Sequence, residues 1–184
     1  MRQFLALLLA CVFALPTISH AKKVGNKSHF NRTKHSTMAL LSGYMSCSID
    51  MVETDKFDPT FSQLACECLT DAMREGKETA NSSIYCSQYA DKRRDLKKPE
   101  PNAFNRKKWP THALFTYSTS IYNDKRVKYK SVPAWQYSTC EADLLREKID
   151  YSEFVRLGKK KKLSKFFRRF KRSRSLRRCR RYLR

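Results

Sequence analysis

The side chains best suited to bind a charged ligand are gathered in residues 158–184, which we call the tail. The tail contains 15 Lys and Arg and no Asp or Glu, whereas all 17 acidic residues of the chain come before it. Because such a block repels itself without counter-charge, its expected partner is a polyanion. The predicted polyanion-binding residues are Lys159, Lys160, Lys161, Lys162, Lys165, Arg168, Arg169, Lys171, Arg172, Arg174, Arg177, Arg178, Arg180 and Arg181.

The tail also carries apolar residues at the i, i+3, i+4, i+7 spacing of one helix face. These predicted interfacial residues are Leu163, Phe166, Phe167 and Phe170. Cations around an aromatic stripe are typical of an amphipathic helix that lies on a membrane surface. At about 100° per residue, the apolar residues between 176 and 183 fall near the opposite side. We therefore expect a bend or an interruption at residues 172–175.

Three interpretations of the tail compete. It is a solvated, disordered segment, or it binds anionic lipid, lipopolysaccharide or cell-wall polymer, or it binds nucleic acid or sulfated polysaccharide. We favour the second, because an aromatic stripe has little use in simple charge neutralisation. The third would rest on contacts of Arg with phosphate or sulfate and would weaken strongly with salt. The sequence indicates no particular protein partner.

Six cysteines remain once residues 1–21 are set aside as a leader that contains Cys11. They are Cys47, Cys66, Cys68, Cys86, Cys140 and Cys179. An even number of cysteines in an exported chain predicts a disulfide framework. Zinc binding is the alternative, but the single residue between Cys66 and Cys68 is too short a gap for common zinc motifs. We therefore expect no metal and no other cofactor.

The helical pattern around Cys66 and Cys68 limits how the cysteines pair. At about 100° per residue these two side chains point to directions about 200° apart, so they should not pair with each other. One of them should face Cys47, and the other should reach Cys86 or a later cysteine. The sequence does not choose between them.

The last cysteine, Cys179, lies within the tail. We favour a bridge from Cys179 to Cys140, which would hold the tail on the body, over an exposed thiol with a lowered pKa and a tendency to form dimers. The segment Arg169-Phe-Lys-Arg172 also looks like a proprotein-convertase cleavage site. Cleavage there would separate residues 173–184 unless a disulfide kept them attached.

Catalytic groupings are scarce. The sequence has no Gly-x-Ser-x-Gly elbow, no glycine-rich phosphate loop and no His-Glu-x-x-His. An exported nuclease or other hydrolase that uses His112 with carboxylates from elsewhere in the chain is the enzymatic alternative. We expect a protein without enzymatic activity, in which His112 has no chemical role.

The first residues indicate export. Residues 1–21 combine a positive charge at Arg2, an apolar run and the small-x-small sequence Ser19-His-Ala21, as in a secretory signal peptide. Residues 22–35 are polar and basic, and we interpret them as an N-terminal arm. Glycosylation triplets begin at Asn26, Asn31 and Asn81 if the source is eukaryotic.

The body, residues 36–157, begins with helical patterns. We predict helices at about 37–54, 59–75, 82–94 and 139–156. The second is the clearest, because Asp58 can cap it, Pro59 suits its first turn and Gly76 supplies a stop. Ser138 and Glu141 form a possible capping box for the last. Prolines punctuate the linker 95–110, where Trp109 is expected to dock on the core rather than stack on nucleobases or lipid.

Residues 112–132 change to an alternating pattern. Aromatic and β-branched residues flank Asn123-Asp-Lys125, and Pro133 follows the second run. This pattern predicts a β-hairpin. The expected fold is therefore α+β and mainly helical, a small disulfide-stapled helical cluster with a β-hairpin and a C-terminal cationic amphipathic helix. The expected protein is secreted or periplasmic, peripheral on a membrane surface, and docks on an anionic surface through its tail.

Overall fold

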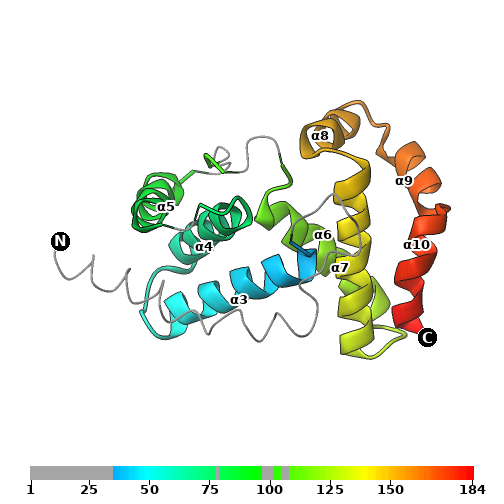
Figure 1. Ribbon diagram of the computed structural model, residues 1–184, viewed down its shortest axis with the longest axis horizontal. Helices are drawn as coiled ribbons and strands as arrows, with labels where there is room; N and C mark the ends of the chain where they lie inside the picture. Colours follow the sequence, from blue (N-terminus) through cyan, green and yellow to red (C-terminus); the bar gives the residue numbers. More distant parts are fainter. Residues whose placement is uncertain (1–34, 78, 97–101, 105–107) are drawn as a thin grey trace. The chain divides into compact units, whose positions relative to one another are not determined.

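The computed structural model describes residues 35–77, 79–96, 102–104 and 108–184, which are helices joined by turns, with no strand among them (Figure 1). The predicted signal peptide, most of the predicted basic arm and much of the predicted linker lie outside the described residues. The chain divides into two compact units, and each is described by itself. The first contains residues 39–104, and the second contains residues 35–38 and 108–184.

The helices of the first unit match the sequence prediction closely. They are α3 (Thr37–Glu53), whose first two residues belong to the second unit, α4 (Pro59–Arg74) and α5 (Ala80–Arg93). Asp58 caps α4, because its carboxylate accepts hydrogen bonds from the backbone N–H groups of Thr60 and Phe61 at 2.9 and 3.0 Å. Gly76 follows α4 with a φ of 66°, the left-handed conformation that glycine adopts without strain.

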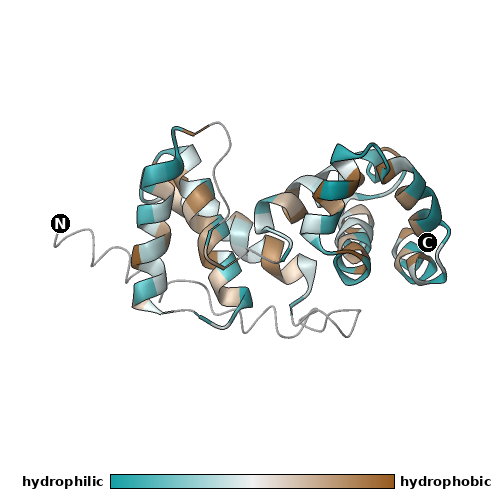
Figure 2. Cartoon of the chain, turned by 90° about the horizontal axis from the view of Figure 1, so that it is seen from above, coloured by the Kyte–Doolittle hydropathy of each residue, from teal (hydrophilic) through white to brown (hydrophobic). Residues whose placement is uncertain are grey.

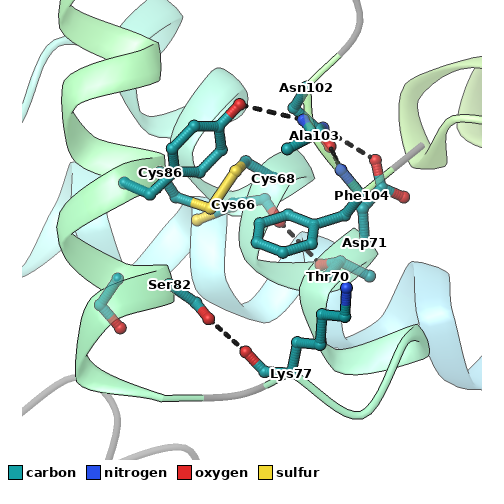
Figure 3. Close-up of a disulfide and its surroundings, with 12 residues drawn as sticks. Cys66, Cys68, Thr70, Asp71, Lys77, Ser82, Cys86, Asn102, Ala103 and Phe104 are labelled. Atoms are coloured by element: carbon teal, nitrogen blue, oxygen red, sulfur yellow. Dashed lines mark hydrogen bonds between the residues drawn. A yellow bond between two sulfur atoms is a disulfide. The ribbon is translucent and has the colours of Figure 1, made fainter. Parts of the chain in front are cut away.

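Disulfides join α4 to both of its neighbours. Cys66 pairs with Cys47 of α3, and Cys68 pairs with Cys86 of α5, the bridge drawn in Figure 3. Cys66 and Cys68 therefore do not pair with each other, as predicted. The structure also shows that Cys66 is the partner of Cys47, which the sequence left open. All of these cysteines except Cys47 are fully buried, so the bridges lie inside the helical cluster.

A short segment of the linker is fixed on the first unit. The Asn102 side chain donates to the Asp71 carboxylate at 3.0 Å and accepts from the backbone N–H of Phe104 at 2.9 Å (Figure 3). Asp71 also forms an ion pair with Arg74 at 3.2 Å. Both Asn102 and Asp71 are fully buried, so these hydrogen bonds satisfy polar groups that have lost contact with water.

The second unit contains the remaining helices. They are α6 (Thr111–Lys125), α7 (Ser131–Lys148), α8 (Tyr151–Lys159), α9 (Leu163–Lys171), α10 (Arg174–Cys179) and the 3-10 helix η1 (Arg180–Leu183). α6 packs on α7, and α10 and η1 also pack on α7 (Figure 1). None of the described helices has both the length and the apolar composition that a membrane span requires.

The predicted β-hairpin at 112–132 is wrong, because this segment forms α6 and the turn that leads to α7. The buried residues of α6 are Thr111, Leu114 and Ser118, which share one helix face. Two of the three are polar, so the helical period is hidden in the hydropathy pattern. Pro133 lies in the first turn of α7, where its missing N–H costs no helical hydrogen bond.

The predicted last helix of the body, 139–156, is wrong in its bounds. α7 begins at Ser131 and ends at Lys148, and Ile149 adopts an extended conformation before α8. Ser138 and Glu141 therefore lie inside α7 and form no capping box. Glu141 is only 3 % exposed and lies in the core of the second unit.

Trp109 is part of this core. Its side chain is 3 % exposed, and its indole N–H donates to the backbone carbonyl of Ile149 at 2.8 Å. The Trp109 ring lies 5.2 Å from that of Tyr151 and 4.7 Å from that of Phe154, both on α8. This confirms that Trp109 docks on the core, and the buried ring has no face left for a nucleobase or a lipid.

Candidate polyanion-binding surface

The tail folds onto its own unit. α10 is bound to α7 by the Cys140–Cys179 disulfide, which confirms the favoured pairing of these two cysteines. α9 ends at Lys171, and Ser173 caps α10 by accepting from the backbone N–H of Leu176 at 3.4 Å. The predicted interruption between the two halves of the tail is therefore confirmed, and it lies at Arg172 and Ser173.

Every predicted polyanion-binding residue is exposed. These residues are Lys159, Lys160, Lys161, Lys162, Lys165, Arg168, Arg169, Lys171, Arg172, Arg174, Arg177, Arg178, Arg180 and Arg181. We call their outward surface the cationic face. Within the described part of the chain, no Asp or Glu forms an ion pair with any of them. The helices that lead to the C-terminus are coloured largely as hydrophilic in Figure 2.

The predicted interfacial residues are buried or half-buried. Phe170 is 5 % exposed, and Leu163, Phe166 and Phe167 are half-buried. The Phe167 ring lies 6.1 Å from that of Phe154 on α8 and 6.2 Å from that of Tyr117 on α6. Packing within the second unit therefore accounts for the apolar stripe.

A buried carboxylate lies among these aromatic residues. Glu141 of α7 accepts a hydrogen bond from the Tyr117 hydroxyl at 3.0 Å, and its charge also acts on Tyr137. Burial raises the pKa of Tyr117, and the charge and the hydrogen bond of Glu141 raise it further. Burial and Glu141 also raise the pKa of Tyr137, while the nearby Arg180 guanidinium opposes them. Both tyrosines therefore stay protonated, and Tyr117 holds this carboxylate in place through its hydrogen bond.

Sequence reasoning missed a second group of cations, because it assigned them to the hairpin. They lie in the α6–α7 turn, residues 126–130, where Arg126, Lys128 and Lys130 are exposed. Lys125, at the end of α6, places its ammonium group 5.9 Å from the centre of the Tyr137 ring, and Arg180 of η1 contacts the same side chain. Tyr137 thus connects the turn with the cationic face. The Arg-Val-Lys-Tyr-Lys run was the signal that could have revealed these cations.

The enzymatic alternative centred on His112. This residue is exposed on the first turn of α6, and in the described part of the chain no hydrogen bond or ion pair joins it to a carboxylate. The same residues contain no group of three or more His, Cys, Asp or Glu that could hold a metal ion.

All six predicted disulfide cysteines are paired, which confirms the disulfide framework and leaves none of them for zinc. Disulfides in this number indicate an extracellular or otherwise oxidising compartment. The chain matches no protein-family model, no curated protein and no solved structure. Its interpretation therefore rests on its own residues.

Proposed function

We propose that the protein is exported and binds an anionic surface through the cationic face of its tail. The observation that carries the proposal is that Phe170 of the tail is buried, whereas the predicted cations are exposed and form no ion pair with an Asp or Glu of the described residues. A basic residue close to an anionic bilayer contributes about 1 kcal/mol, so three or four such contacts suffice for measurable binding. The leader composition and the disulfides support export.

The folded state of the tail supports this function in a second way. The Cys140–Cys179 disulfide holds α10 on α7, so the spacing of the cations exists before a partner arrives. A preformed arrangement loses less conformational freedom on binding than a disordered tail does. Because the contacts are ionic and exposed, binding should weaken as the salt concentration rises.

Nucleic acid and sulfated polysaccharide are the second candidate class. The burial of Phe170 and the contacts of Phe167 with Phe154 and Tyr117 favour them, because these two rings already pack on the protein. Arg residues also suit phosphate and sulfate groups, which accept paired hydrogen bonds.

The test uses the oxidised protein and a variant in which Arg168, Arg169 and Arg172 are changed to Gln. The matched control changes Lys77, Lys92 and Arg94, exposed cations of the first unit, to Gln and alters the net charge equally. All three proteins are titrated against vesicles that contain anionic lipid, against heparin and against duplex DNA over a salt series.

We expect the tail variant to lose about 100-fold in affinity at low salt, as three contacts of about 1 kcal/mol imply. The control should stay within about threefold of the unchanged protein. Equal losses in the two variants would show that only net charge matters. That result, or full retention of binding by the tail variant, would overturn the proposal.

A further inference from the structure

The α6–α7 turn and the start of α7 expose apolar side chains that the fold leaves uncovered. Val127 is 81 % exposed, Val132 is 66 % exposed and Tyr129 is 37 % exposed. Single exposed apolar residues are common on proteins, but three within six residues of the sequence give this stretch an unusual amount of exposed apolar surface. Clusters of this kind, rimmed by polar residues, mark sites of interaction with a protein or a membrane.

The turn is ordered by its own backbone. Lys128 and Tyr129 donate their N–H groups to the carbonyl of Lys125 at 3.0 and 3.1 Å, and Ala134 donates to the carbonyl of Lys130 at 3.1 Å. These bonds satisfy backbone groups that would otherwise need water. A segment with paired backbone groups enters an apolar phase at lower cost than one without them.

Cations alternate with the apolar side chains. Arg126 precedes Val127, and Lys128 and Lys130 flank Tyr129. Long basic side chains can keep their charged ends at the headgroups while their stems follow an inserted apolar neighbour. Tyrosine is itself enriched at membrane interfaces. The nearby acid, Asp124, forms an ion pair with Lys125 at 2.6 Å, so its charge is matched locally.

The turn is continuous with the cationic face. It enters α7 at the end where the chain terminates (Figure 1), where η1 packs on α7 and Lys125 lies over the ring of Tyr137 of α7. An anionic plane that reaches η1 is therefore also within reach of the turn. Neither duplex DNA nor heparin offers an apolar phase for valine, whereas a bilayer does.

We propose that the α6–α7 turn inserts Val127, Tyr129 and the adjoining Val132 into the interface of an anionic lipid bilayer. The proposal rests on the proposed function, because it identifies a bilayer as the anionic surface. It also replaces the predicted role of the tail phenylalanines. The tail supplies the attraction by charge, and the turn supplies the apolar contact.

The test uses the full oxidised protein with Val127→Ser and Val132→Ser combined, which we call the turn variant. Both side chains are exposed, so the fold should be retained, which circular dichroism checks. The control combines Ile49→Ser and Ile84→Ser, which changes two apolar residues of the first unit that are 49 % and 38 % exposed. The probes are vesicles of phosphatidylglycerol and phosphatidylcholine, and duplex DNA.

We expect the affinity of the turn variant for vesicles at moderate salt to fall by about tenfold or more, while its affinity for DNA is unchanged. The control should bind both probes as the unchanged protein does. A Tyr129→Trp variant should show a blue shift of tryptophan emission with vesicles, and quenching by lipids brominated in the acyl chain. It should show neither change with DNA.

The two proposals fail in different ways. If the tail variant loses vesicle binding while the turn variant keeps it and the Tyr129→Trp variant shows no emission shift, the turn does not insert and this inference is overturned. If the tail variant keeps all binding, the proposed function is overturned. Vesicle binding lost by the turn variant alone would support insertion and move the charge attraction away from the tail.

Discussion

The ring of Phe167 in the tail stacks on the ring of Tyr117 in α6, with centroids 6.2 Å apart and planes 10° from parallel. Tyr117 in turn donates to the buried Glu141 of α7. One tail residue is thus connected, through a single aromatic partner, to the polar centre of the second unit. The apolar side of α9 belongs to the core, which has consequences for stability.

Removal of a tail ring should destabilise the fold. Phe170 is 5 % exposed, and Phe170→Ala should lower the free energy of unfolding by about 3 kcal/mol, because buried Phe→Ala substitutions leave a cavity. Urea unfolding measures this change. The neighbouring exposed Arg169→Ala should alter the stability by less than about 0.5 kcal/mol. Equal, small effects of both substitutions would show that Phe170 is not packed.

The Cys140–Cys179 bridge should stabilise the second unit. It closes a loop with a sequence separation of 39 residues, for which chain entropy gives about 4 kcal/mol. Changing both cysteines to Ser, so that no thiol is left unpaired, should lower the denaturant midpoint by a corresponding amount. Limited trypsin digestion should then cut first within residues 159–181. Unchanged resistance to trypsin would contradict a structural role of the bridge.

Glu141 should stabilise the fold as a hydrogen-bond acceptor. Glu141→Leu removes the hydrogen-bond partner of the Tyr117 hydroxyl group, and a buried donor left unpaired costs about 1–3 kcal/mol. Glu141→Gln keeps an acceptor oxygen and should be the milder change. Thermal unfolding at neutral pH compares the two variants, and a greater loss with Gln than with Leu would refute this account.

Ser118 offers a stabilising substitution. Its hydroxyl is buried on α6 and has no hydrogen-bond partner among the described residues. Ser118→Ala should raise the free energy of unfolding by about 1 kcal/mol, since it removes an unpaired polar atom and places a better helix former. Ser120→Ala, on the exposed side of the same helix, gains only the helix propensity. The difference between the two variants in urea unfolding isolates the effect of burial.

Stability should fall at alkaline pH. Burial, and then the charge of Glu67, raise the pKa of Tyr44 from 10.0 to about 12. Below pH 10 the folded and unfolded states both keep this proton, so the stabilising contribution is fully present. Between about pH 10 and 12 the unfolded state releases it first, and Tyr44 alone should lower the free energy of unfolding by about 1.4 kcal/mol per pH unit. Tyr117 and Tyr137, whose pKa values are also raised, add to this decline.

Urea unfolding across this pH range tests the effect of Tyr44. Tyr44→Phe should make the decline shallower by about 1.4 kcal/mol per pH unit, and the decline that remains belongs to the other buried tyrosines. An identical slope in the protein and in the Tyr44→Phe variant would exclude Tyr44 as its cause.

How well the sequence predicted the fold depended on whether local signals agreed. For α4 the cap at Asp58, the proline after it and the stop at Gly76 all indicate one helix, and the prediction was right. For α6 the buried face includes Thr111 and Ser118, so hydropathy follows the alternation of aromatic and β-branched residues instead. The buried residues of α6 recur at helical spacing, but the apolar residues do not. Which residues are buried is known only from the packed structure.

The candidate site was also predictable only in part. The charge of the tail is a property of composition, so its cations could be identified before the fold was known. The phenylalanine spacing predicts one apolar helix face but does not say what covers that face. Contacts with Tyr117 and Phe154, distant in sequence, decide this. The exposed valines at the α6–α7 turn escaped detection because they were assigned to strands.

The Cys140–Cys179 bridge also makes a covalently closed loop within the second unit. The chain between the two cysteines contains α8 and α9, so both helices lie inside that loop. A proteolytic cut within Arg169-Phe-Lys-Arg172 would therefore open the loop without releasing residues 173–184, which would stay joined to α7 through sulfur.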